Sequence, residues 1–122
     1  MKPWLLAAAL AATLVPSAAF AQVETGGWVL AKYKGGNFFY TAEVVRISGN
    51  VVTVKYESGA VENLYRQQVK TYDWATGTQL QCRASDGKYY TGSIVKITED
   101  DRIDVLYGRT RQWAVSKNCR SW

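Results

Sequence analysis

The chain has 122 residues, with 15 Lys and Arg against 10 Asp and Glu, and a formal net charge of +5 at pH 7. It contains no histidine, which excludes an imidazole base and any histidine-ligated metal site. A basic excess of this size keeps a small domain soluble and weakly favours polyanions, but it does not by itself define a nucleic-acid-binding protein.

Residues 1–21 have the pattern of a secretory signal peptide. A basic start is followed by an apolar stretch over residues 4–15 and then by small residues that end in Ala-Phe-Ala. An uncleaved membrane anchor is the alternative, because the apolar stretch nearly reaches spanning length. Pro16 and the A-x-A site favour cleavage. We therefore expect a periplasmic or secreted protein that begins at Gln22 and has no stable membrane insertion.

The first half of the remaining chain predicts five short strands. They are rich in β-branched and aromatic residues and cover residues 28–33, 38–47, 51–56, 61–64 and 69–72. Gly, Asn and Ser separate them and tolerate the positive φ of tight turns. No segment has a sustained helical period, so the pattern predicts an all-β unit.

The second half repeats the first. Gly26 to Val45 is matched by Gly77 to Val95, and such self-similarity indicates a duplicated structural unit. We expect units over residues 22–74 and 75–122, each near the lower size limit for an independent core.

The register between the halves follows from the two-residue period of a strand. One deletion in the first loop keeps the inward faces in phase. It pairs Val29 with Leu80, Ala31 with Cys82, Tyr33 with Ala84, Tyr40 with Tyr90 and Tyr56 with Tyr107. The remaining strands then align as 61–64 with 112–115 and 69–72 with 119–122.

The two cysteines, Cys82 and Cys119, fall on the first and last strands of the second unit in this register. Those strands are neighbours when such a unit closes into a barrel. In an exported protein an even cysteine count favours a structural disulfide. A catalytic or metal-binding thiol pair is the alternative, but the spacing is not C-x-x-C and no histidine is present to complete a site.

Short motifs in both halves resemble the Tudor domain and its Agenet relatives. In the first half they are G-x-V-x-A-x-Y at 27–33, Y-x-A at 40–42 and V-T-V-K-Y at 52–56. The second half repeats them at 80–82, 89–92 and 103–107. The resemblance implies two tandem five-stranded SH3-like barrels that recognise ligands, often methylated Lys or Arg held in an aromatic cage.

Carried over to this sequence, the resemblance makes Tyr33, Tyr40 and Tyr56 the cage walls and Glu57 their candidate acidic partner. Ring faces attract a weakly hydrated cation, and a carboxylate adds Coulomb attraction. The cage is expected in the first barrel, because Ala84 replaces one wall in the second. The hairpin after Tyr56 is shorter than in typical caged Tudor domains. The alternative is a structural role, in which the tyrosines cover the core and anchor their hydroxyls at the surface.

No residue pattern predicts catalysis. The chain has no nucleophile in a recognisable setting, no glycine-rich phosphate loop and no zinc-binding cluster. The alternative is catalysis by a pair of carboxylates, either Glu57 with Glu62 or two residues of the run 99–101. We interpret that run as a solvated hairpin tip. It also lacks the ligand spacing of a calcium-binding loop. We expect a protein that is not an enzyme and has no metal or cofactor.

Two binding functions stay open. The first is recognition of a peptide or protein partner outside the cytoplasm, through the tyrosines of the first barrel or through a sheet edge. The second is binding of a polyanion, either nucleic acid or acidic envelope glycan, through Arg83, Arg109 and Arg111 in the more basic second half. A scaffolding role without a small ligand is the third possibility.

Overall fold

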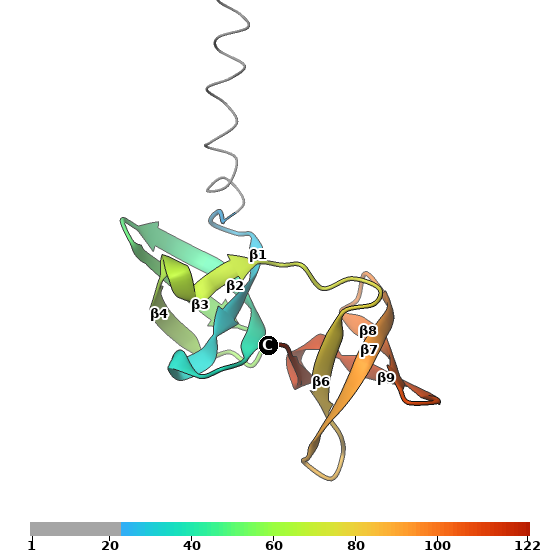
Figure 1. Ribbon diagram of the computed structural model, residues 1–122. Coiled ribbons are helices and arrows are strands. Elements are labelled where there is room, and N and C mark those ends of the chain that lie inside the picture. Colours follow the sequence, from blue (N-terminus) through green and yellow to red (C-terminus); the bar gives the residue numbers. More distant parts are fainter. Residues whose placement is uncertain (1–22) are drawn as a thin grey trace, which may run out of the picture.

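The computed structural model describes residues 23–122, so the predicted signal peptide lies outside the described residues. The first five strands are β1 (Trp28–Lys32), β2 (Phe39–Ser48), β3 (Val51–Tyr56), β4 (Val61–Tyr65) and β5 (Val69–Thr71). The next five are β6 (Gln79–Arg83), β7 (Tyr89–Ile97), β8 (Arg102–Tyr107), β9 (Thr110–Val115) and β10 (Cys119–Arg120). Three 3-10 turns connect them, η1 (Tyr33–Gly35), η2 (Arg66–Gln68) and η3 (Ser116–Asn118). Figure 1 shows two small barrels, which confirms the all-β class and the tandem SH3-like architecture.

Both sheets have the same topology. Their strand orders are β4-β3-β2-β1-β5 and β9-β8-β7-β6-β10, so the last strand of each unit returns to its first. Each long second strand carries a bulge at the same place, at Val45 in β2 and at Val95 in β7. A bulge bends its strand and increases the local twist, which lets a short sheet curl into a barrel. The duplication therefore extends to an irregularity of the backbone.

The register of the two sheets confirms most of the predicted alignment. Ala31 pairs with Val69 in the first sheet, as Cys82 pairs with Cys119 in the second. Ala31 also pairs with Tyr40, as Cys82 pairs with Tyr90.

The predicted alignment of the fourth strands is wrong by one residue. Leu64 pairs with Val52, and Ala114 pairs with the equivalent Ile103, so residues 61–64 correspond to 111–114 and not to 112–115. The reason is a difference in turn length. The turn between β8 and β9 has two residues, and the corresponding turn between β3 and β4 has one more.

Each barrel has its own hydrophobic core, but the second core includes residues from outside its sheet. The first core consists of Val29, Ala31, Ala42, Val44, Val52, Val54, Tyr56, Leu64 and Val69. The second contains Leu80, Cys82, Ile94, Ile103, Val105 and Cys119, together with Trp74 and Leu30. Leu30 belongs to β1 of the first barrel and is 0% exposed. β1 is therefore buried on both faces, which explains its continuous apolar run. The predicted unit boundary at Trp74 remains a prediction.

The C-terminal segment joins the two barrels through backbone hydrogen bonds. The Phe39 N–H donates to the Ser121 carbonyl at 2.7 Å, and the Ser121 N–H donates back to the Phe39 carbonyl at 3.0 Å. The buried Trp74 indole N–H donates to Ser121 Oγ at 3.0 Å. In Figure 1 the C-terminus accordingly lies between the barrels. The two units are connected by ordered pairing as well as by the linker.

Cys82 and Cys119 face each other across the β6–β10 pair. Their Cα atoms lie 4.0 Å apart and their sulfurs are at disulfide-bonding distance. The residues at the same positions of the first barrel are Ala31 and Val69, which pack without a covalent link. The bridge therefore strengthens one of two otherwise similar sheets.

Replacing the pair with the residues of the first barrel tests this role. In the chain-entropy model, Cys82→Ala/Cys119→Val loses about 4 kcal/mol of stability, because the closed loop of 37 residues becomes free in the unfolded chain. Urea unfolding followed by tryptophan fluorescence measures the change. Dithiothreitol should destabilise the wild type and leave the variant unaffected. Equal unfolding free energies for the wild type and the variant would rule out the bridge as a stabilising element.

Gly92 offers a second test of the fold. Its Cβ position would lie 2.5 Å from Val105 Cγ1 and 2.9 Å from the Leu106 carbonyl oxygen, whereas the matching position in β2 holds Ala42. Gly92→Ala should therefore lower the unfolding free energy by about 1–3 kcal/mol through overpacking. Ser93→Ala, one residue along the same strand, is the control and should have a smaller effect. A Gly92→Ala variant as stable as the wild type would contradict this close approach.

Candidate ligand-binding site

The turn after β1 sets the first wall of the site. Lys34 and Gly35 have φ of 51° and 67°, and this bend presents the Tyr33 ring beside the sheet. The Lys34 N–H lies 3.1 and 3.2 Å from the two carboxylate oxygens of Glu62 on β4. The Tyr56 hydroxyl donates to the same carboxylate at 2.7 Å. One carboxylate therefore fixes both the turn and a second aromatic wall.

The three predicted cage tyrosines are brought together. The Tyr33 ring centroid lies 6.0 Å from that of Tyr40 at an interplanar angle of 71°. It lies 5.1 Å from that of Tyr56 at 89°. These edge-to-face arrangements are favourable for aromatic pairs and form a concave corner. Tyr33 is 37% exposed and Tyr56 only 4%, so Tyr33 is the outer wall and Tyr56 combines a core position with a place in the site.

Glu57, the predicted acidic partner, is held from both barrels. Its Oε1 atom accepts hydrogen bonds from the Thr41 hydroxyl and, at 2.6 Å, from the Ser116 hydroxyl of η3. Thr41 and Ser116 are buried, while Glu57 is half-buried. The carboxylate is therefore fixed in place at the junction and does not move freely on the surface.

A cavity of about 260 Å³ lies between these groups. It is lined by Tyr33, Tyr40, Thr41, Tyr56, Glu57, Ser58, Arg83, Tyr89 and Lys117, and we call it the tyrosine cavity. Arg83, Tyr89 and Lys117 come from the second barrel, so the site lies at the junction and not in the first barrel alone. The sequence signal for this contribution is the Tyr89-Tyr90 pair. Neighbouring residues of a strand point to opposite faces, so one of the two rings must point away from its own barrel.

Arg120 holds two walls of the tyrosine cavity and was not singled out by the sequence. Its guanidinium carbon lies 3.8 Å from the Phe38 ring centroid and 3.6 Å from that of Tyr89, which places the cation between two aromatic faces. Its Nη1 donates to the Tyr40 hydroxyl at 3.3 Å, and its Nε donates to Gln81 Oε1 at 3.0 Å. Arg120 thus links a wall of the first barrel to a wall of the second.

Two tyrosines of the cavity, Tyr56 and Tyr89, remain neutral at physiological pH because their pKa values are raised. Burial raises the pKa of Tyr56, and the hydrogen bond and charge of Glu62 raise it further. Burial also raises the pKa of Tyr89, with a smaller contribution from Tyr40. Neutral rings present their electron-rich faces without a competing phenolate charge.

The equivalent face of the second barrel is open. Ala84 occupies the position of Tyr33, and Gln112 occupies that of Glu62. A wide groove of about 860 Å³ results, which we call the second-barrel groove. Its lining includes Arg83, Tyr90, Arg102, Tyr107 and Trp113. Arg83 lines this groove and the tyrosine cavity, so the two hollows meet at this residue.

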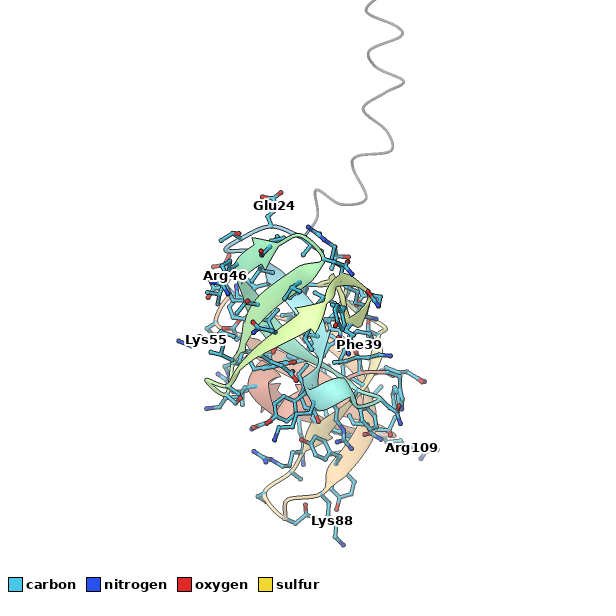
Figure 2. All side chains as sticks on the ribbon, turned by 90° about the vertical axis from the view of Figure 1, so that its left-hand side faces the viewer. Glu24, Phe39, Arg46, Lys55, Lys88 and Arg109 are labelled. Carbon is cyan, nitrogen blue, oxygen red and sulfur yellow. A yellow bond between two sulfur atoms is a disulfide. The ribbon has the colours of Figure 1, made fainter. Side chains whose placement is uncertain are left out.

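The structure separates the three arginines predicted to bind a polyanion. Arg83 Nη2 contacts Asn118 Oδ1 at 3.3 Å beside the tyrosine cavity. Arg111 forms an ion pair with the buried Asp104. Arg109 lies in the turn after β8, and Figure 2 shows it at the side of the molecule. Neither hollow is lined by all three.

Over residues 23–122, no cluster of three or more His, Cys, Asp or Glu side chains is placed to hold a metal ion. In the same part of the chain, no helix has the length and apolarity required to cross a bilayer. What the site offers chemically is aromatic faces, one fixed carboxylate and two cationic side chains.

The Asp104–Arg111 pair predicts a pH dependence of stability. The hydrogen bond from Arg111, followed by the charges of Arg111 and Lys96, lowers the pKa of Asp104 below 3.8 against the opposing effect of burial. A depressed folded-state pKa stabilises the fold above the unfolded pKa, and this contribution is lost as the pH falls through the folded value. Asp104→Asn should therefore be less stable than the wild type at neutral pH, with a difference that shrinks below pH 3.8. Urea unfolding across this range measures it, and a pH-independent difference would contradict the assignment.

The comparisons with known proteins concern the fold. No protein-family model matches the chain, and no curated protein matches its sequence. The tandem Tudor domains of Crb2 match with a TM-score of 0.63 and 16% identity, covering 81% of this chain and 80% of that chain. Tandem Agenet domains 3-4 of ADCP1 match with a TM-score of 0.40 and 14% identity, covering 87% of this chain and 84% of that chain. AGD34 of Arabidopsis thaliana AGDP1 matches with a TM-score of 0.42 and 14% identity, covering 87% of this chain and 86% of that chain. The likeness to the Crb2 domains shows that the two barrels have the tandem Tudor fold.

Proposed function

We propose that this protein is an exported binding module, not an enzyme, which takes a cationic side chain of a peptide or protein partner into the tyrosine cavity. The observation that carries the proposal is the convergence of Tyr33, Tyr40 and Tyr56 on a cavity of about 260 Å³ with Glu57 at its edge. Residues 22–74 and 75–122 act together in this proposal, because both units line the cavity.

The chemistry of the lining favours an alkylated ammonium or a guanidinium group. Such cations are weakly hydrated, so contact with ring faces compensates the loss of water. In the described part of the chain, both hydrogen bonds to Glu57 end on Oε1, which leaves Oε2 available to a ligand. A fixed carboxylate next to the rings adds Coulomb attraction without an ordering cost at the time of binding.

One sequence feature supports export, and one structural feature is compatible with it. The pattern of residues 1–21 is that of a cleaved signal peptide, and Cys82 and Cys119 lie at disulfide-bonding distance. A disulfide persists in the periplasm or outside the cell and is rare in the cytosol. The polyanion alternative has less support, because Arg111 is already paired with Asp104.

Tyr33→Ala is the sharpest test of the cavity. The second barrel carries Ala84 at this position, so the fold tolerates alanine there. We expect the variant to bind N-acetyl-trimethyllysine amide roughly tenfold more weakly than the wild type, because one aromatic wall of the cation site is lost. NMR titration of the mature protein, monitored through backbone amide shifts, measures the affinity.

Tyr65→Ala is the matched control, since Tyr65 is also exposed but does not line the cavity. It should bind the probe like the wild type. Unchanged affinity in Tyr33→Ala, with both variants folded, would exclude the tyrosine cavity as the cation site.

A further inference from the structure

The charges around the tyrosine cavity do not match a ligand that carries only a cation. Arg83 and Lys117 line the cavity together with the single carboxylate of Glu57. The formally charged lining is therefore net positive, so Arg83 and Lys117 oppose part of the attraction that the rings and Glu57 exert on an isolated ammonium group. Both basic side chains are exposed, so they are accessible to a ligand.

The two kinds of charge come from different barrels. Glu57 and the rings of Tyr33 and Tyr56 belong to the first, and Arg83 and Lys117 belong to the second. Arg83 is attached to η3 through Asn118, the residue after Lys117, at 3.3 Å. One side of the cavity is thus suited to a cation and the other to an anion.

The second-barrel groove indicates how large the ligand is. It shares Arg83 with the tyrosine cavity, and its lining includes Tyr90 and Trp113. A small zwitterion fills the cavity alone, whereas an extended chain that passes Arg83 also occupies the groove. Trp113 is 48% exposed and lies 4.9 Å from the Arg102 guanidinium carbon, measured to its ring centroid, so the groove presents an aromatic ring with its paired cation to such a chain.

We infer that the ligand is a peptide in which a cationic side chain lies within a few residues of an acidic one. The first barrel holds the cation between its tyrosines, Arg83 and Lys117 hold the acid, and the chain continues into the second-barrel groove. This inference rests on the proposed function and specifies the ligand of the same site. It predicts recognition of two opposite charges at a fixed separation.

The test compares pairs of trimethyllysine peptides that carry either Glu or Gln at one of the four positions before or the four positions after the modified lysine. Fluorescence anisotropy with the mature wild-type protein should show, for at least one position, a Glu peptide that binds about tenfold more tightly than its Gln counterpart. Added salt should reduce this preference, because the basic side chains are exposed.

The double variant Arg83→Gln/Lys117→Gln distinguishes recognition of the acidic side chain from a structural role of these two residues. It should abolish the preference for Glu and at the same time bind the Gln peptides more tightly than the wild type does, because the repulsive charges are removed. Lys88→Gln/Arg109→Gln is the matched control. It removes the same charge from outside the tyrosine cavity and should behave like the wild type (Figure 2). If the double variant is unstable, Lys117→Gln alone should show a smaller change in the same direction.

The outcomes separate this inference from the proposed function. Equal binding of Glu and Gln peptides at all positions overturns the two-charge inference and leaves the cation site standing. Failure of every trimethyllysine peptide to bind overturns both. If free phosphocholine binds as tightly as the best peptide, the ligand is a small zwitterion and the peptide assignment is wrong.

Discussion

The backbone pairing between Ser121 and Phe39 is the constraint on which the candidate site depends. It places the last strand between β6 of its own sheet and the start of β2 of the other. The buried Leu30 reinforces this arrangement, because the core of the second barrel is incomplete without a side chain from the first. Units of about fifty residues bury little apolar surface on their own, so a shared core is a direct way to stabilise both. The cavity walls contributed by each barrel meet only in this arrangement.

Arg120 shows why the junction requires one particular side chain. A planar guanidinium stacks on Phe38 and Tyr89 at once and still directs N–H groups at Tyr40 and Gln81. A lysine ammonium is compact and has no plane to stack, so it cannot make both contacts in this way. The same residue therefore stabilises the junction and orients two aromatic walls, which couples the site to the packing of the barrels.

Sequence reasoning succeeded where strand periodicity and duplication determine the outcome. Tyr33, Tyr40 and Tyr56 meet because their strands are neighbours in one barrel, and Cys82 meets Cys119 for the same reason. The fourth strands were misaligned because the two turns differ in length, which hydrophobic pattern alone does not reveal. Ser116, Tyr89 and Arg120 were missed because their roles depend on how one barrel packs against the other. A repeat predicts each unit, but it contains no information on the contact between them.

Sequence differences between the two units explain why the same barrel topology forms a narrow tyrosine cavity in one place and the wide second-barrel groove in the other. In the first barrel, Glu62 binds the turn that carries Tyr33, and this contact narrows the space beside the sheet. In the second, Ala84 has no ring, and Gln112 replaces the acceptor carboxylate, so the same space stays wide. In the proposed function, the narrow hollow takes a single side chain and the wide one a length of chain, in keeping with volumes of about 260 and 860 Å³. Because Arg83 lines both, a ligand that enters the first hollow and leaves through the second passes a positive charge on the way.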